Sequence, residues 1–363
     1  MSAPTTTPRG WRLGSLAGVP VYLGQSWVVV AAAITLLFGP RVDDLVPGTG
    51  SAGYAVAFGF ALLLLFSVLV HEAAHAVTAR LCGYQVNRIV ADFWGGHTAY
   101  DAAGSTPGRA ALVAISGPLA NAALAAVAWP LTQALSGGLP WLLLTAFTTT
   151  NAFVAAFNLL PGLPLDGGFL VDSLVWKVTG SRGMGTLVAG WCGRLLVLGL
   201  AWWIVGVPLM SGAGISLSRL VWGGLIGAFL WVGAGSAVRT GRARRSFETV
   251  TVGAVWRPVS SVAENTPVDR VPWDRGLWLT TDAHGIPTGL VDAAALHAVP
   301  GAARAQTTVA AVAQRQPAGW VVDTRRDDPV TDVVVAMQTH QAPVVAVRLP
   351  DGSVPAIVLA ADL

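Results

Sequence analysis

The chain has 363 residues, of which 53% are hydrophobic and only 11% are charged. Because soluble globular proteins carry about 25% charged residues, this composition excludes an ordinary water-soluble enzyme. Up to residue 245, Lys and Arg number 14 and Asp and Glu 7, whereas beyond it the counts are 8 and 12. We therefore expect two domains, a basic and apolar one over residues 1–245 and a mildly acidic one over 246–363. No basic cluster is interleaved with aromatic residues, so nucleic acid is not an expected partner.

Six apolar segments are long enough to cross a bilayer, whose hydrocarbon core takes about 20 helical residues. Gly and Pro residues stand at most of the joins between them. If all six segments cross, most Arg residues fall on one side, and Lys and Arg favour the cytoplasmic side. The sequence thus predicts a multi-pass protein of the cell membrane with both termini in the cytoplasm. The predicted spans cover residues 20–39, 54–81, 109–135, 141–160, 187–210 and 217–238.

The second apolar segment carries the pentapeptide His71-Glu72-Ala73-Ala74-His75. Residues four apart project from one face of a helix, so both imidazoles can reach one metal ion with Glu72 beside it. Chance would supply roughly 0.001 such pentapeptides in a chain of this composition, which makes the motif specific. Ionisable residues at membrane depth are costly and mark functional sites. The pattern predicts a metal site inside the membrane that is reachable from the cytoplasm.

A catalytic zinc ion usually has three protein ligands and one open position, so a third ligand is needed. Asp166 is the strongest candidate because it follows the fourth segment, on the same side of the membrane as His75. Two Pro residues break the helix before it, and two Gly residues after it allow the backbone to approach the metal closely. The alternative is that this segment is a plain connecting turn. Asp92 and Asp101 lie in a polar segment that solvation alone explains.

Together these residues resemble the site-2 protease family of intramembrane zinc metalloproteases, which pairs a membrane-embedded HExxH with a distal NxxPxxxxDG segment. The distal segment corresponds here to the stretch from Asn158 to Gly167. The resemblance covers the membrane half of the chain. It implies that His71, His75 and Asp166 bind one Zn²⁺ per chain and that Glu72 is the catalytic base for peptide-bond hydrolysis.

Other positions also match family motifs. Gly117-Pro118-Leu119-Ala120-Asn121 corresponds to a GPxxN element, and Gly95 and Gly96 resemble the Gly-Gly loop of a membrane re-entrant β-hairpin, here near residues 86–101. This hairpin offers a strand edge for an extended substrate. Asn121 and Asn158 are candidates to hydrogen-bond the substrate backbone or the oxyanion. The alternative for both Asn residues is packing between helices.

After Ser246, short β-branched runs alternate with polar turns, as in a small α/β domain. A unit of about 50 residues recurs over 251–299 and 307–363. The tail resembles a pair of cystathionine-β-synthase-type (CBS) repeats, which in some members of the family follow the last span and bind adenine nucleotides. Of the expected acidic ribose-binding positions only Asp362 is kept, so dimerisation or substrate presentation is the alternative role.

The sequence therefore predicts an α-helical polytopic membrane protein with about six transmembrane helices and a re-entrant β-hairpin, followed by a cytosolic α/β CBS-pair domain. The resemblance implies cleavage within or near transmembrane segments of other membrane proteins, as in regulated intramembrane proteolysis. Expected partners are those substrates, the lipid bilayer, an adenine nucleotide at the tail and a second copy of the chain. The alternatives are a non-catalytic membrane scaffold or regulator that keeps the protease fold, and a transporter with an accidental motif.

Overall fold

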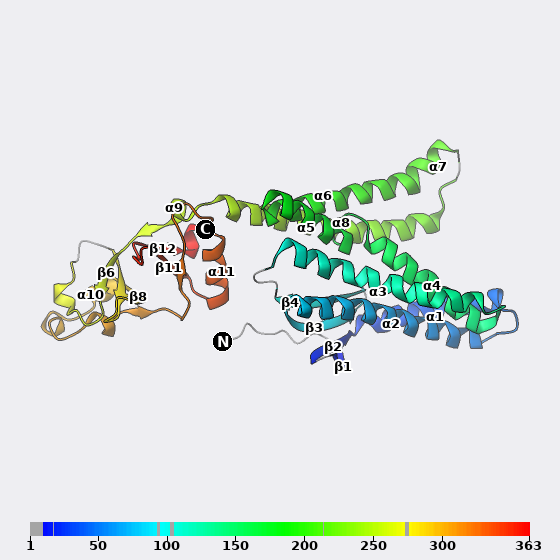
Figure 1. The fold of residues 1–363 in the computed structure, drawn as a ribbon, viewed down its shortest axis with the longest axis horizontal. Coiled ribbons are helices and arrows are strands. Elements are labelled where there is room, and N and C mark those ends of the chain that lie inside the picture. The colour runs from blue at the N-terminus through cyan, green and yellow to red at the C-terminus, as the bar shows by residue number, and fades with distance from the viewer. Residues whose placement is uncertain (1–9, 17, 93–94, 102–104, 213, 273–275) are drawn as a thin grey trace. The chain divides into compact units, whose positions relative to one another are not determined.

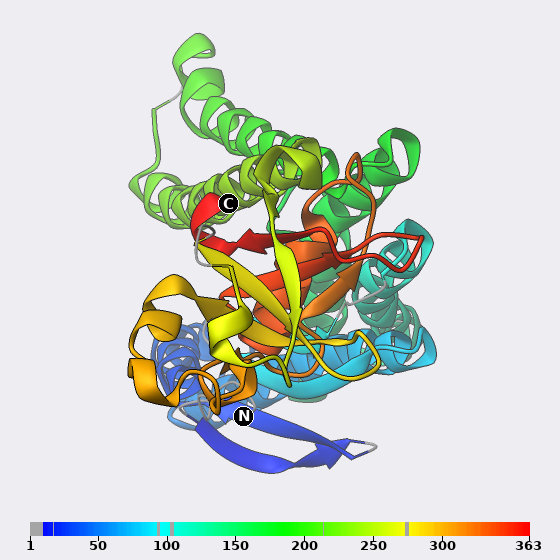
Figure 2. The same cartoon turned by 90° about the vertical axis from the view of Figure 1, so that its left-hand side faces the viewer.

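The computed structural model describes the chain except for residues 1–9, 17, 93–94, 102–104, 213 and 273–275 (Figure 1). The chain divides into two compact units, Met1–Arg242 and Ala243–Leu363. The first is mainly helical and carries one small sheet, whereas the second is built on two sheets (Figures 1 and 2).

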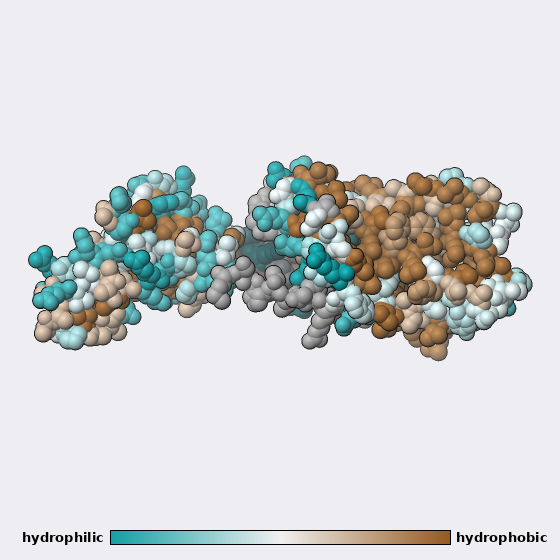
Figure 3. Space-filling model, turned by 90° about the horizontal axis from the view of Figure 1, so that it is seen from below, coloured by the Kyte–Doolittle hydropathy of each residue, from teal (hydrophilic) through white to brown (hydrophobic). Residues whose placement is uncertain are grey.

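Five helical segments of the described chain are long and apolar enough to cross a membrane. Large apolar side chains cover their outer surfaces, as the brown region over the first unit in Figure 3 shows. Water-soluble monomers rarely expose apolar patches beyond a few hundred Å², so this surface is that of a multi-pass membrane protein. The five are α2 (Ala52–Leu81), α3 (Pro107–Gln133), α4 (Gly138–Asn158), the segment Arg182–Met210, and α8 (Leu217–Thr249). Within Arg182–Met210, α6 (Arg182–Ala201) continues through a π-helical turn (Trp202–Gly206) into α7 (Val207–Met210).

The N-terminal segment departs from the sequence-based expectation of a span over residues 20–39. Residues Val19–Gly24 form strand β2, and helix α1 (Ser26–Leu45) begins only afterwards. The apolar stretch between Ser26 and Pro40 is shorter than the roughly 20 residues that a span needs. The alternating, partly β-branched sequence of Val19–Gly24 favours a strand, which explains the difference. The structure thus supports five spans, and the total of six stays a prediction.

The small sheet of the first unit has the order β1-β2-β3-β4. Strands β1 (Gly10–Leu16) and β2 form one antiparallel hairpin, and β3 (Gln85–Asp92) and β4 (Gly95–Asp101) form the hairpin predicted near residues 86–101. β2 and β3 join the two hairpins in parallel. Ile89 of this sheet packs with Ala76 of α2 in a small core, which holds β3 and β4 against the helix that carries the HExxH pentapeptide.

The second unit contains two four-stranded sheets with matching topology, of order β6-β7-β8-β9 and β10-β11-β12-β5. Each has one parallel pair followed by two antiparallel pairs. The two sheets thus repeat one topology, and the repeat bounds 251–299 and 307–363 stay a prediction. The last strand of each sheet comes from the chain just before the other repeat: β5 joins the second sheet and β9 the first. The strands are β5 (Arg257–Pro258), β6 (Ser260–Ala263), β7 (Leu277–Thr281), β8 (Pro287–Asp292), β9 (Gln314–Arg315), β10 (Val321–Asp323), β11 (Val344–Arg348) and β12 (Ala356–Leu359).

Two helices accompany these sheets, α10 (Ala293–His297) and α11 (Thr331–His340), and the short α9 (Val252–Val255) precedes them. A separate apolar core gathers residues of both sheets, among them Leu279 and Leu290 of the first and Ala346 and Ile357 of the second. The described part of this unit thus folds around shared apolar contacts between its two repeats.

Candidate metal centre

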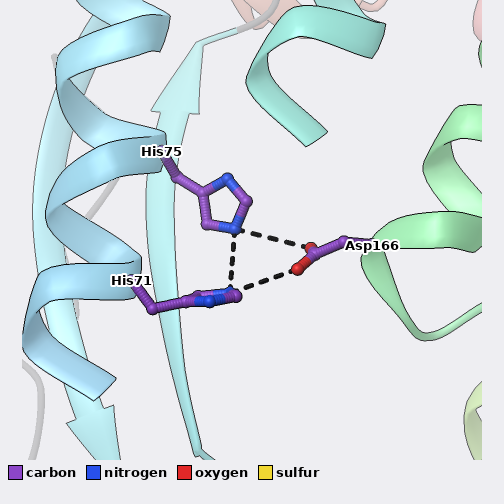
Figure 4. Close-up of side chains that lie close together, drawn as sticks. All are labelled: His71, His75 and Asp166. Carbon is purple, nitrogen blue, oxygen red and sulfur yellow. Dashed lines mark hydrogen bonds and ion pairs between the residues drawn. The ribbon is translucent and has the colours of Figure 1, made fainter. Parts of the chain in front are cut away.

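His71 and His75 lie four residues apart on α2, and their rings project from the same face of the helix toward Asp166 (Figure 4). His71 Nε2 lies 3.1 Å from Asp166 Oδ2, and His75 Nε2 lies 3.5 Å from Asp166 Oδ1. The two Nε2 atoms are 3.1 Å apart. Within the described part of the chain, these three side chains form the group of His, Cys, Asp or Glu residues whose ligand atoms can share one metal ion.

Asp166 is positioned by the irregular segment between α4 and α5 (Asp166–Thr179). This segment is anchored on α6, because Leu163 N donates a hydrogen bond to Ala189 O at 3.1 Å. A Cβ on Gly168 would lie 2.7 Å from Gly162 O, so the first turn of α5 packs against the segment that precedes it. The sequence suggested that these glycines admit the backbone to the metal. Their close approach is instead to this preceding turn, which fixes the direction in which Asp166 points.

The hydrogen bonds on the far side of the two rings fix which nitrogen of each histidine carries the proton and which is free to bind a metal ion. His71 Nδ1 is 2.5 Å from Asn121 Oδ1, and His75 Nδ1 is 2.7 Å from Val113 O. Both partners are acceptors, so each Nδ1 carries the proton and each Nε2 presents a lone pair. Such outer hydrogen bonds are typical of metal-binding histidines.

Three electron-rich groups therefore converge without a proton between them. Two Nε2 lone pairs and the Asp166 carboxylate repel one another unless a cation lies among them. Asp166 Oδ2 is also buried and receives no hydrogen bond. Two imidazoles and one carboxylate are a ligand set of catalytic zinc sites. The residues present thus fit a zinc ion.

Glu72 is 5% exposed and stands next to this group without belonging to it. Thr98 of β4 donates a hydrogen bond to Glu72 Oε2 at 2.9 Å. On the same strand, a Cβ on Gly96 would lie 2.7 Å from Glu72 Cγ, so the absence of a side chain there lets the strand approach the glutamate. Thr98 was not foreseen from the sequence, because nothing in a hairpin sequence tells which residue meets the helix.

Two cavities meet at the site, and both are lined by Glu72 and Asp166. The first, about 330 Å³, also has polar groups from Tyr100, Asp172 and Arg182. The second, about 650 Å³, is mainly apolar and draws on α1, α2, α4 and α8. The reactive groups thus lie between a polar and an apolar space. Apolar lining residues of the second cavity include Trp27, Leu64, Val68, Val154, Phe157 and Phe229.

The two asparagines predicted to reach the substrate lie in different surroundings. Asn158 lines the apolar cavity beside Asp166. Asn121 is 1% exposed, and its two polar atoms contact His71 Nδ1 and Asn151 Oδ1. Asn121 therefore supports a histidine instead of facing a cavity. Asn151 was not predicted from the sequence, since it belongs to no motif.

The other residues predicted from the sequence, Gly95 and Asp362, lie outside the metal group. Gly95 pairs with Asp92 at the end of the hairpin. In the second unit, Arg257 donates two hydrogen bonds to the Asp362 carboxylate, and these hold the pKa of Asp362 below its usual value. The acidic position that was expected to bind a ribose is thus engaged by an arginine of the same unit.

Comparisons with known proteins point the same way as this geometry. Residues 59–138 match the model of peptidase family M50. The "Putative zinc metalloprotease sll0528" of Synechocystis sp. is 29% identical over 282 residues, which cover 75% of this chain and 73% of that protein. The "Putative zinc metalloprotease Rip3" of Mycobacterium tuberculosis is 32% identical over 236 residues, which cover 61% of this chain and 57% of that protein.

Two solved structures are each similar to part of the chain. The site-2 protease from Methanocaldococcus jannaschii matches with 22% identity and a TM-score of 0.42, over 63% of this chain and 95% of that one. The CBS domain of a bacterial CNNM/CorC family Mg²⁺ transporter matches with 11% identity and a TM-score of 0.27, over 33% of this chain and 76% of that one.

The helical membrane unit carries an HExxH helix and a group of three possible zinc ligands, which together are the features of a membrane metalloprotease. The M50 match covers the segment that carries the HExxH pentapeptide. The match to the model of peptidase family M50 and the similarity to proteins named zinc metalloproteases confirm the resemblance to site-2 proteases found in the sequence.

Proposed function

We propose that this protein is an intramembrane zinc endopeptidase that hydrolyses peptide bonds within or near the transmembrane segments of other membrane proteins. The observation that carries the proposal is the convergence of two histidine lone pairs from the apolar helix α2 with the Asp166 carboxylate from the start of α5, with Glu72 beside them. The intact set also speaks against a non-catalytic scaffold, because a scaffold has no need to bury an acid at membrane depth.

In this proposal His71, His75 and Asp166 hold the zinc ion, and Glu72 is the general base. Zinc, when bound, supplies Lewis-acid polarisation of the scissile carbonyl and activation of water. Glu72 accepts the proton of the attacking water and passes it to the leaving amine. Thr98 holds one carboxylate oxygen of Glu72 by its hydroxyl, which keeps the base in one orientation.

The surroundings of the site support a substrate that is apolar and locally extended. The second cavity is lined by aromatic and aliphatic side chains, which suit the side chains of a transmembrane segment. In the described part of the chain, no other strand pairs with the outer edge of β4. This edge, with Gly95 and Gly96, is proposed to pair with the unwound substrate. Asn158, which also lines the apolar cavity, is proposed to contact the substrate.

Zinc content and chelation test this function. The purified full chain in lipid nanodiscs is expected to contain about one zinc ion per chain and to cut a reporter protein that has a single transmembrane helix. Treatment with 1,10-phenanthroline should abolish cleavage, and added Zn²⁺ should restore it, whereas a serine-protease inhibitor should have no effect. Cleavage that persists after the metal has been removed would contradict the proposal.

Thr98→Val is expected to slow cleavage about tenfold, because it removes one hydrogen bond to a charged group. The zinc content should stay at the wild-type value, since Thr98 contacts Glu72 and none of the three ligands. The measurement is the initial rate of reporter cleavage with metal analysis on the same sample. Thr98→Ser keeps the hydroxyl and serves as the matched control; equal rates for the Val and Ser variants would argue against this role.

For the location we propose a cell-membrane protein with both termini in the cytoplasm. This topology requires an even number of spans, and hence that α1 crosses the membrane in addition to the five spans described above; the distribution of Arg residues supports it. The tail is proposed to be a CBS pair, supported by its two sheets of matching topology. Its ligand is either an adenine nucleotide or a second copy of the chain. Melting of the full chain with and without ATP, together with its mass in nanodiscs, distinguishes these two.

A further inference from the structure

A chain of buried amides runs behind His71 and crosses three helices. Asn121 Oδ1 on α3 contacts His71 Nδ1, and Asn121 Nδ2 donates to Asn151 Oδ1 on α4 at 2.7 Å. Asn151 Nδ2 in turn donates to Phe147 O and to Ser67 Oγ, both at 2.9 Å. Ser67 lies on α2, one turn before His71. Asn121, Asn151 and Ser67 are 1%, 0% and 3% exposed, so water does not supply alternative partners.

The direction of these hydrogen bonds follows from one main-chain carbonyl. Phe147 O can only accept, so the atom of Asn151 that faces it must be the NH₂ group. Asn151 Oδ1 therefore faces Asn121. Because this oxygen can only accept, Asn121 must donate to it from its NH₂ group. Asn121 Oδ1 is then left for His71, whose Nδ1 must carry the proton. The result is a lone pair on His71 Nε2.

His75 has the same tautomer, with the proton on Nδ1, but a single direct hydrogen bond fixes it. Its Nδ1 lies directly against a main-chain carbonyl, Val113 O, at 2.7 Å. Both metal-facing nitrogens therefore depend on a backbone acceptor. His75 contacts its backbone acceptor directly. The backbone acceptor for His71 fixes the tautomer only indirectly, by orienting the side-chain amides of Asn151 and Asn121.

We propose that Asn151 is a positioning residue of the metal site: by accepting from Asn121 it fixes the orientation of the Asn121 amide, and through it the tautomer in which His71 can bind a metal ion. The inference rests on the zinc site proposed above. Without Asn151, the Asn121 amide can rotate and present its NH₂ group to His71. His71 would then carry its proton on Nε2, the nitrogen that must be free to coordinate.

The first expected result is a weaker zinc site in Asn151→Ala. Zinc affinity, measured by competition with a chelator of known affinity, should fall about 10- to 100-fold, as for the loss of other outer partners of zinc ligands. Thr148→Val is the matched control. Thr148 is buried on the same helix, but its hydroxyl donates to Leu144 O of its own helix, so this variant should keep the wild-type affinity.

The decisive measurement is the same substitution in an Asn121→Asp background. Both oxygens of an Asp side chain accept, so His71 Nδ1 keeps an acceptor whichever way the group turns. Asn151→Ala should then change zinc affinity by less than about twofold. A residue that only fills space would instead lower the affinity by the same factor in both backgrounds, since its packing defect does not depend on the orientation of residue 121.

Equal losses in the two backgrounds, or no loss in the wild-type background, would overturn the role of Asn151. A wild-type chain that binds no zinc would overturn the proposed function itself, which keeps the two failures distinct. Melting curves of the zinc-free proteins report whether each variant is folded. Should Asn151→Ala not fold, Asn151→Ser, whose hydroxyl is too short to reach Asn121, takes its place with the same expected outcomes.

Discussion

Glu72→Gln is expected to reduce cleavage by about 10²- to 10⁴-fold, the contribution typical of a general acid–base residue, while leaving the zinc content unchanged. Gln has nearly the shape of Glu and can still receive the hydrogen bond from Thr98, but it cannot accept a proton from water. The measurement combines the rate of reporter cleavage with metal analysis and a melting curve.

The control for this variant is Glu264→Gln, which changes the same side chain in the second unit, where Glu264 forms an ion pair with Arg315. This variant should cleave at the wild-type rate. A folded, zinc-loaded Glu72→Gln protein that still cuts the same reporter would show that Glu72 is not the base. If the prediction holds, the inactive variant can also be used to retain bound substrates for identification.

Asp166→Ala is expected to remove both zinc and activity. It deletes one of three converging ligands, so its effect on zinc affinity should exceed the about 10- to 100-fold loss that follows removal of an outer partner. The variant should therefore purify with far less than one zinc ion per chain, as measured by metal analysis, and high added Zn²⁺ should restore binding before it restores cleavage.

Asp44→Ala provides the comparison, because Asp44 is exposed on α1 and lies outside the metal group. Its zinc content should match that of the wild type. An Asp166→Ala protein with a full complement of zinc would mean that Asp166 is not a ligand, and that the segment after α4 is only a connection.

The centre of the site was accessible from the sequence because its parts obey local rules. Helical periodicity alone places His71 and His75 on one face, and the Pro and Gly residues around Asp166 mark a break where a carboxylate can approach that face. The contacts around this centre were not accessible. Thr98 meets Glu72 only because β4 lies along α2, and Asn151 meets Asn121 only because α3 and α4 pack side by side.

The start of the first predicted span at residue 20, where the structure has strand β2, was misplaced for a similar reason. An apolar run shows that a segment avoids water. It does not show whether the segment is a strand packed on a helix or the first turns of a membrane-spanning helix. In this region the alternating sequence of Val19–Gly24 favours a strand, and pairing with β1 and β3 selects it. Of these two partners, β3 lies far along the chain and cannot be recognised from the segment itself. The asparagines show the same limit, because Asn121 and Asn158 look alike in sequence and differ only in what surrounds them.

The exchange of β5 and β9 between the two sheets of the tail bears on its folding cooperativity. Neither sheet is complete without a strand that precedes the other repeat. Opening one repeat therefore removes hydrogen bonds from the sheet of the other, and both lose the apolar core that they share. We therefore expect the two repeats to unfold together in one transition, so that a ligand bound to one of them raises the stability of the other as well.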